Sequence, residues 1–141
     1  MHRPALWKTL FTSLWMGACL SASVSAETRT LSCEVTYAGQ TQLISVAPTR
    51  SPYDQAAVAI SNRFRFKAVH VQGEDVTPRI GIYVYLETER QPLLIQHVLL
   101  QPPYPQAPMG SRVDLLGEQR LYAGPLEREL IYRCFLGQGT P

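Results

Sequence analysis

Residues 30–47 read TLSCEVTYAGQTQLISVA, and this stretch decides the fold class. Its first half alternates between apolar and polar side chains, which is the pattern of a β-strand with one buried face. On that apolar face lie Leu31, Cys33, Val35 and Tyr37. Gly39 and Gln40 indicate a tight turn into a second strand over 41–47, so the stretch predicts an antiparallel hairpin.

The same period of two recurs in the segments 63–72, 79–89, 93–101 and 126–136. Segment 79–89, RIGIYVYLETE, alternates most regularly. Segment 93–101, LLIQHVLLQ, is apolar on both faces apart from Gln96 and His97, as in a central strand. Within 63–72 the apolar phase shifts near Lys67 and Ala68, which predicts a bulge. We therefore expect a mainly β fold, an antiparallel sandwich or barrel of about six to seven strands.

At most one short helix is expected. Ser51, Pro52 and Asp54 resemble a helix start, with a cap, a proline in the first position and an acid in the first turn. Helical spacing of the apolar residues that follow favours a short helix here. The alternative is that residues 57–60 run directly into the strand that contains Phe64.

The N-terminal residues 1–26 have the order of a cleaved secretory signal peptide: positive charge, an apolar run, then small residues. Cleavage before Glu27 would leave one β-rich domain over 27–141 and a periplasmic or secreted protein. The alternative is a lipoprotein signal in which Cys19 is lipidated and anchors the chain to a membrane.

Cys33 and Cys134 are the two cysteines that remain after cleavage, one near each end of the domain. Export leads to an oxidising compartment, so we expect a disulfide between them. Such a bond would join the first strand to the last and close a loop of about 100 residues, which stabilises the fold by up to roughly 4.7 kcal/mol.

Charge and composition exclude several classes of function. The chain has 13 basic and 11 acidic residues, and loss of Arg3 and Lys8 with the signal leaves the domain formally neutral. A neutral domain gives no electrostatic reason to bind nucleic acid. His70 and His97 lie in predicted strands without the serine motif of a hydrolase, so no catalytic residue is predicted.

No metal site and no cofactor are predicted either. The nearest approach to a metal site is a set formed by His70, His97 and Met109, which the fold would have to bring together. Acidic pairs such as Glu87 with Glu89 and Glu127 with Glu129 lie beside arginines, and cross-strand ion pairs explain them more simply than glycosidic chemistry.

Four residues are candidates for binding. Tyr83 and Tyr85 share a strand face with Gly81, where they form either a second core layer or an aromatic platform for a sugar or peptide. His97 is the candidate polar group of a nearby cleft. Tyr104 lies in the proline-rich connector 101–108, which predicts a stiff surface rod with a projecting recognition residue, or else a plain crossover between strands.

Two hypotheses of function follow. The leading one is an exported, non-enzymatic binding or accessory module that contacts another envelope protein. The alternative is a small-molecule or carbohydrate binder that uses a tyrosine-lined face. A flat apolar patch or a free strand edge would favour the first hypothesis, and a concave pocket lined by tyrosines would favour the second.

Overall fold

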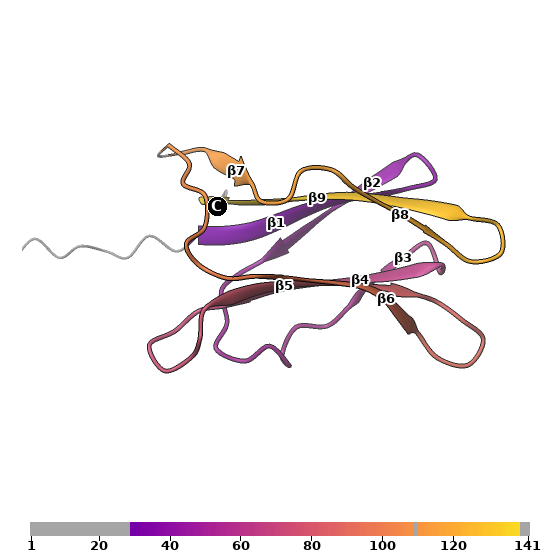
Figure 1. The fold of residues 1–141 in the computed structure, drawn as a ribbon, viewed down its shortest axis with the longest axis horizontal. Coiled ribbons are helices and arrows are strands. Elements are labelled where there is room, and N and C mark those ends of the chain that lie inside the picture. The colour runs from indigo at the N-terminus through magenta and orange to yellow at the C-terminus, as the bar shows by residue number, and fades with distance from the viewer. Residues whose placement is uncertain (1–28, 109, 139–141) are drawn as a thin grey trace, which may run out of the picture.

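The structure is a computed structural model that describes residues 29–108 and 110–138. Two antiparallel sheets pack face to face (Figure 1), and the described ranges contain nine strands and no helix. The strands are β1 (Arg29–Tyr37), β2 (Gln40–Val46), β3 (Val58–Ile60), β4 (Phe64–Val71), β5 (Arg79–Leu86), β6 (Leu93–Leu100), β7 (Arg112–Asp114), β8 (Gln119–Ala123) and β9 (Arg128–Gln138). The prediction of an antiparallel β fold is confirmed, in its sandwich form.

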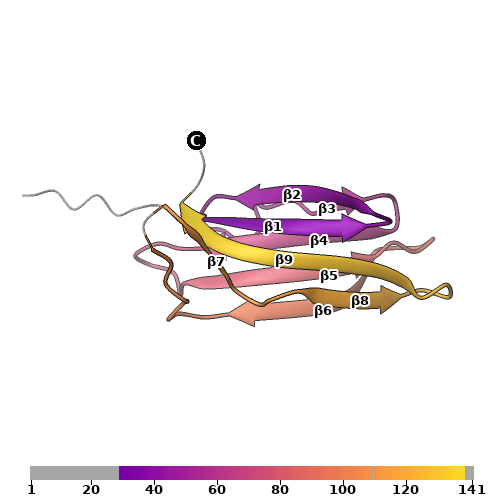
Figure 2. The same ribbon diagram turned by 90° about the horizontal axis from the view of Figure 1, so that it is seen from above.

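The first sheet has the order β2-β1-β9, and both β7 and β8 pair with the far side of β9. The second sheet is the meander β3-β4-β5-β6. The β2–β3 link and the connector after β6 both cross from one sheet to the other at the left-hand end of Figure 1. Seen from above, β6 of one sheet and β8 of the other lie along the same side of the sandwich (Figure 2).

The predicted hairpin of residues 30–47 forms from β1 and β2. Its turn residues are Ala38 and Gly39, with φ angles of 49° and 77°, and two successive positive φ angles match the right-handed twist of the flanking strands. The turn lies one residue earlier than the sequence predicts, and β2 already begins at Gln40.

The core lies between the sheets and is built from the alternate residues that the sequence pattern marks. Leu31, Cys33 and Val35 from β1 are fully buried, as are Phe64 and Phe66 from β4. Further fully buried residues include Ile80, Ile82 and Val84 from β5 and Leu130, Tyr132 and Cys134 from β9.

Cys33 and Cys134 face each other directly in the β1–β9 pairing and form the predicted disulfide. Their Cα atoms are 4.1 Å apart, and the bond closes a sequence separation of 101 residues between the first and last strands. A disulfide of this kind is typical of an extracytoplasmic protein.

Two local predictions are wrong. Residues 51–57 form turns and loop instead of a helix, because Val58–Ile60 pairs with Phe64–Phe66 as β3, and this tertiary pairing outweighs the local cap. No bulge occurs at Lys67 and Ala68, where β4 pairs with β5 in continuous register. The bulge instead lies opposite Val84 and Tyr85, on β6.

The shift of apolar phase in β4 has a different cause. Its last three residues, Val69, His70 and Val71, are all buried, so this end of the strand is covered on both faces. Thr49 contributes to the cover, because it pairs with Val71 beyond the end of β3 and exchanges backbone hydrogen bonds with His70 and Gln72.

The prediction of a central strand over 93–101 is also wrong. β6 is an edge strand that pairs only with β5 among the described residues. On its outer face Leu94, His97 and Leu99 are exposed.

The predicted signal peptide, with Cys19 and the cleavage point before Glu27, lies outside the described residues. Within the described ranges there is no helix of the length and apolarity needed to cross a membrane.

Candidate functional site

The outer face of the second sheet gathers the binding residues that the sequence singles out on β5 and β6. Tyr83 pairs with Lys67 on one side and with His97 on the other, so the three side chains form one row across three strands. The rings of Tyr83 and His97 are stacked, with centroids 4.3 Å apart and planes 11° apart. The amine of Lys67 lies 6.0 Å from the centroid of the Tyr83 ring.

Tyr83 occupies the space that Gly81 leaves on this face. A Cβ atom at Gly81 would come within 2.9 Å of the Tyr83 ring, so the glycine makes room for the aromatic side chain. The tyrosine and the glycine gap therefore do not form an open slot for a ligand. Tyr83 and Tyr85 are half-buried on the outer face, and neither belongs to the inner core layer.

Leucines from β6 continue this surface to the edge of the sheet. Leu94 pairs with Tyr85 and Leu99 pairs with Gly81, which places both leucines on the same outer face as His97. Leu94 is 47% exposed and Leu99 is 49% exposed. We call the set Tyr83, Tyr85, Leu94, His97 and Leu99 the outer patch.

The backbone beside the outer patch is unpaired along one side. β6 has eight residues and no charged side chain, and no described strand pairs with its far edge. The bulge at Ile95 divides it, which leaves Gln96–Leu100 as the regular stretch. Soluble proteins usually protect such edges with charges, prolines or covering loops, so a long apolar edge is typical of an interaction surface.

The interior side of β6 is anchored by one hydrogen bond between the sheets. The hydroxyl of Tyr132 on β9 donates to Oε1 of Gln96 at 2.7 Å. Burial raises the pKa of Tyr132 to about 12, so this hydroxyl remains a donor at any physiological pH. Gln96, polar in an otherwise apolar strand, thus serves the core and not the edge.

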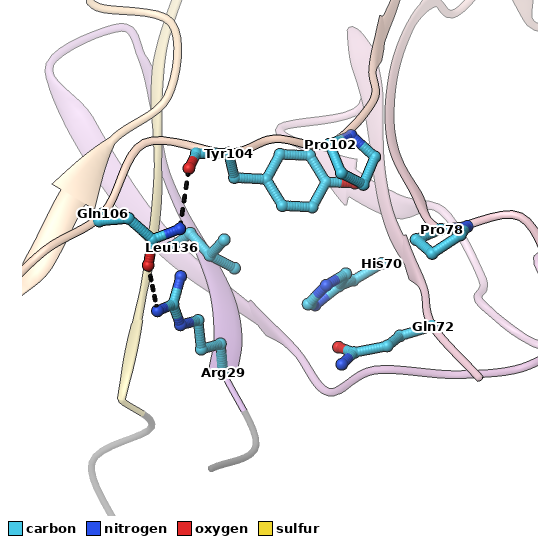
Figure 3. A pocket seen from close by; sticks show the side chains of 8 residues that line it. All are labelled: Arg29, His70, Gln72, Pro78, Pro102, Tyr104, Gln106 and Leu136. Carbon is cyan, nitrogen blue, oxygen red and sulfur yellow. Dashed lines mark hydrogen bonds between the residues drawn. The ribbon is translucent and has the colours of Figure 1, made fainter. Parts of the chain in front are cut away.

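A second feature lies at the end of the sandwich where the links cross. A cavity of about 350 Å³ opens between the start of β1, the end of β4 and the proline-rich connector (Figure 3). Polar groups from Arg29, His70, Gln72, Tyr104 and Gln106 line it. Its apolar wall is formed by Pro78, Pro102 and Leu136.

Two groups in this cavity are buried without a hydrogen-bond partner among the described residues: Nδ1 of His70 and the hydroxyl of Tyr104. Burial lowers the pKa of His70 and raises the pKa of Tyr104, so it favours the neutral form of both side chains. A histidine inside a strand is usually a packing residue whose ring nitrogens have hydrogen-bond partners. His70 differs, because its Nδ1 has none among the described residues.

Tyr104 does not project from the connector. Figure 3 shows its ring turned inward over His70, and it packs against the core while the hydroxyl is hidden from solvent. The expectation of a projecting recognition residue is wrong, because the connector must cover the open end of the core and a phenol ring fills that space. Whether Tyr104 contributes to binding inside the cavity is a separate matter.

The histidines do not converge. His70 lines the cavity on the inner side, whereas His97 lies on the exposed outer face of the second sheet. Met109 lies outside the described residues. Among residues 29–108 and 110–138 no group of three or more histidine, cysteine or acidic side chains is placed to hold a metal ion.

The sequence analysis missed Leu94 and Leu99 in the outer patch, and at the cavity it missed the polar residues Arg29, Gln72 and Gln106. Only tertiary structure reveals Arg29, because its neighbours there come from β4 and from the connector. Leu94 and Leu99 did have a signal, which is the uncharged apolar run of β6.

No protein-family model, curated protein or solved structure matches this chain.

Proposed function

We propose that this protein is an exported binding module whose β6 edge receives an extended segment of another envelope protein as a fifth strand of the second sheet. The observation that supports this proposal is the free, uncharged, apolar edge of β6. An extended peptide is the occupant whose backbone alternates donors and acceptors at the spacing of the unpaired edge.

The chemistry of the edge favours a polypeptide over a sugar or a lipid. Alternate residues of Gln96–Leu100 direct N–H and C=O groups away from β5, and only another strand satisfies them in register. Leu94 and Leu99 flank this line of polar groups, and burying a leucine side chain stabilises a complex by about 1.5–3 kcal/mol. The partner segment is therefore expected to carry apolar side chains at alternate positions.

The carbohydrate alternative has less support. Sugar platforms need an open aromatic face, whereas Tyr83 and His97 stack on each other and Gly81 lies beneath the Tyr83 ring. Exposed leucines next to an edge that no described strand pairs with suit a protein partner better.

The place of action we propose is the periplasm or the extracellular space, after cleavage before Glu27. The support is the signal-like order of residues 1–26 together with the disulfide. Lipidation at Cys19 is the alternative, and the intact mass of the exported protein distinguishes the two. A mature chain that begins at an acylated Cys19 would contradict free diffusion.

The experiment places a photoreactive residue at Leu99 and, as a matched control, at Leu43 on β2 of the other sheet, which is 64% exposed. Crosslinking in the native envelope should give one partner at Leu99, linked through one extended segment, and not at Leu43. A synthetic peptide of that segment should then bind the purified protein and slow hydrogen exchange in the outward amides of Gln96–Leu100. Leu99→Arg should weaken this binding by about tenfold, equivalent to 1.4 kcal/mol, while Leu43→Arg leaves it unchanged.

The proposal is wrong if crosslinks at Leu99 and Leu43 identify the same proteins, or if the peptide protects amides other than those of β6. Crosslinks between two copies of this chain would make β6 a self-association edge, and would also contradict a heterologous partner. Thermal unfolding of Leu99→Arg separates loss of binding from loss of folding, because a half-exposed edge position tolerates this change.

A further inference from the structure

The cavity at the end of the sandwich lies on the inner side of the second sheet, away from the outer patch, and has no part in the function proposed above. Two properties, its volume and a buried polar group without a partner, distinguish it from an ordinary packing void. Its volume of about 350 Å³ falls in the range of small-molecule sites. His70, only 3% exposed, presents an unpartnered Nδ1 within it.

The hydroxyl of Tyr104 is the second unpartnered group, and it comes from the opposite wall, above His70 in Figure 3. Leaving a buried polar group without a hydrogen bond is costly, so native structures satisfy such groups with water or ligand. A neutral imidazole and a phenol together offer one hydroxyl donor and at least one ring nitrogen that can donate or accept.

Arg29 supplies the charge of the cavity. Its guanidinium donates to Oε1 of Gln106 at 2.6 Å, and the amide nitrogen of Gln106 donates to the carbonyl oxygen of Tyr104 at 3.0 Å. This chain of contacts fixes the guanidinium at the cavity. Among residues 29–108 and 110–138, no carboxylate pairs with Arg29 and no acidic side chain lines the cavity.

We infer that this cavity binds a carboxylate: the acid group pairs with Arg29, and a hydrogen-bonding group on the ligand's body reaches His70 and Tyr104 between the walls of Pro102 and Leu136. A guanidinium is the side chain best shaped to hold a carboxylate, through two parallel hydrogen bonds. The carboxylate has two sources, a free small organic acid or the C-terminus of a peptide, and the experiment treats them separately.

The test uses the isotope-labelled, disulfide-bonded domain and four probes in two pairs. The free acid is 4-hydroxybenzoate, compared with 4-hydroxybenzamide, and the peptide is N-acetyl-trialanine with a free or an amidated C-terminus. The readouts are the dissociation constant and the NMR shift of His70 Nδ1. In at least one pair the acid should bind with saturation, about tenfold or more tighter than its amide, a difference of the size expected for a charged hydrogen bond.

Three variants show whether the named groups hold the ligand. Arg29→Gln should remove the preference for the acid over the amide, whereas Arg63→Gln, at the opposite end of β4, should leave it intact. Tyr104→Phe should weaken binding several-fold without lowering the melting temperature, because this hydroxyl has no hydrogen-bond partner among the described residues.

Several results would overturn the inference. The probes are tested up to about 50 mM, which is well above the dissociation constants of weak natural ligands. If neither acid binds more tightly than its amide in this range, the cavity holds only water. Equal binding by Arg29→Gln and the parent protein would remove the assigned role of the guanidinium. Tyr104→Phe with unchanged affinity would make Tyr104 a packing residue alone.

Discussion

The outer faces of the two sheets are built from the same kind of alternating strand, yet they meet the solvent in opposite ways. Four of the five ion pairs among the described residues lie on the first sheet and one on the second. On the first sheet, even the aromatic ring of Phe135 is covered, with the guanidinium of Arg112 3.9 Å above its centroid. On the second sheet, Leu94 and Leu99 have no such cover.

The edges differ in the same way. Along the side that both share, β8 carries Arg120, paired with Glu118 and Glu129, whereas β6 has no charge at all. Charged side chains on an edge strand oppose the addition of further strands, and their absence permits it. The contrast teaches that charged side chains protect the β8 edge, whereas the β6 edge beside it lacks this protection. Each experiment below tests one part of the difference between the two sheets.

The largest effect is expected from the disulfide, which joins two strands of the first sheet. Cys33→Ala with Cys134→Ala should lower the free energy of unfolding by about 2–5 kcal/mol, because a loop of 101 residues is no longer closed in the unfolded chain. Chemical denaturation measures it. Reducing agent should shift the midpoint of the parent protein but not that of the double variant. An equal midpoint for both proteins would mean that the first sheet needs no covalent support.

An intermediate effect is expected from the hydrogen bond that joins the two sheets. Tyr132→Phe should cost about 1 kcal/mol of stability, since it removes the donor to Gln96 and keeps the ring in place. Tyr122→Phe is the matched control, because that hydroxyl donates to Glu129 on the solvated face of the first sheet. Thermal unfolding that responds equally to both substitutions would contradict the distinction between the interior and the solvated face.

The smallest effect is expected from the ion pairs of the first sheet. Burial alone would raise the pKa of Asp114, but hydrogen bonds from Arg133, Gly117 and Leu116 outweigh it and lower the pKa. The carboxylate thus stabilises the fold above its ordinary pKa, and this contribution disappears as pH falls through the lowered value. Asp114→Asn should cost about 0.5 kcal/mol near neutral pH, as exposed pairs do.

The check on this last prediction is a pair of stability profiles against pH. The difference between parent and Asp114→Asn should shrink over the acidic interval in which pH falls through the ordinary pKa of an aspartate, about 3.9, and then through the lowered pKa of Asp114. A difference that stays constant over that interval would show that Asp114 acts through its turn geometry and not through its charge.

The strand pattern of the sequence predicts most of this fold because period-two alternation reports burial on one face. It identifies the strands that build the core, and it predicts the disulfide from the positions of Cys33 and Cys134. The short strands β3, β7 and β8 are missed, since three to five residues carry too little alternation to stand out. Leu126, predicted in phase with the last strand, lies in the turn before it and is exposed.

The sites are less predictable than the fold, and β6 shows why. An uncharged apolar run predicts burial, but it cannot state whether the cover comes from the chain itself or from another molecule. The misplaced central strand is therefore informative, because a local pattern that the tertiary structure leaves unsatisfied often marks a functional surface. The cavity had no signal in the sequence, since its polar groups come from three distant segments.

The arrangement of β1 and β9 has a mechanical consequence. Arg29 pairs with Gln138, so a load applied to the ends of these two antiparallel strands would peel them apart one pair at a time. Only four pairs, Arg29↔Gln138 to Ser32↔Phe135, precede the linked Cys33 and Cys134. The bond arrests the peeling after a release of about 28 Å of chain, and the load then bypasses the whole loop that contains the second sheet. Under tension, the β6 edge would keep its shape.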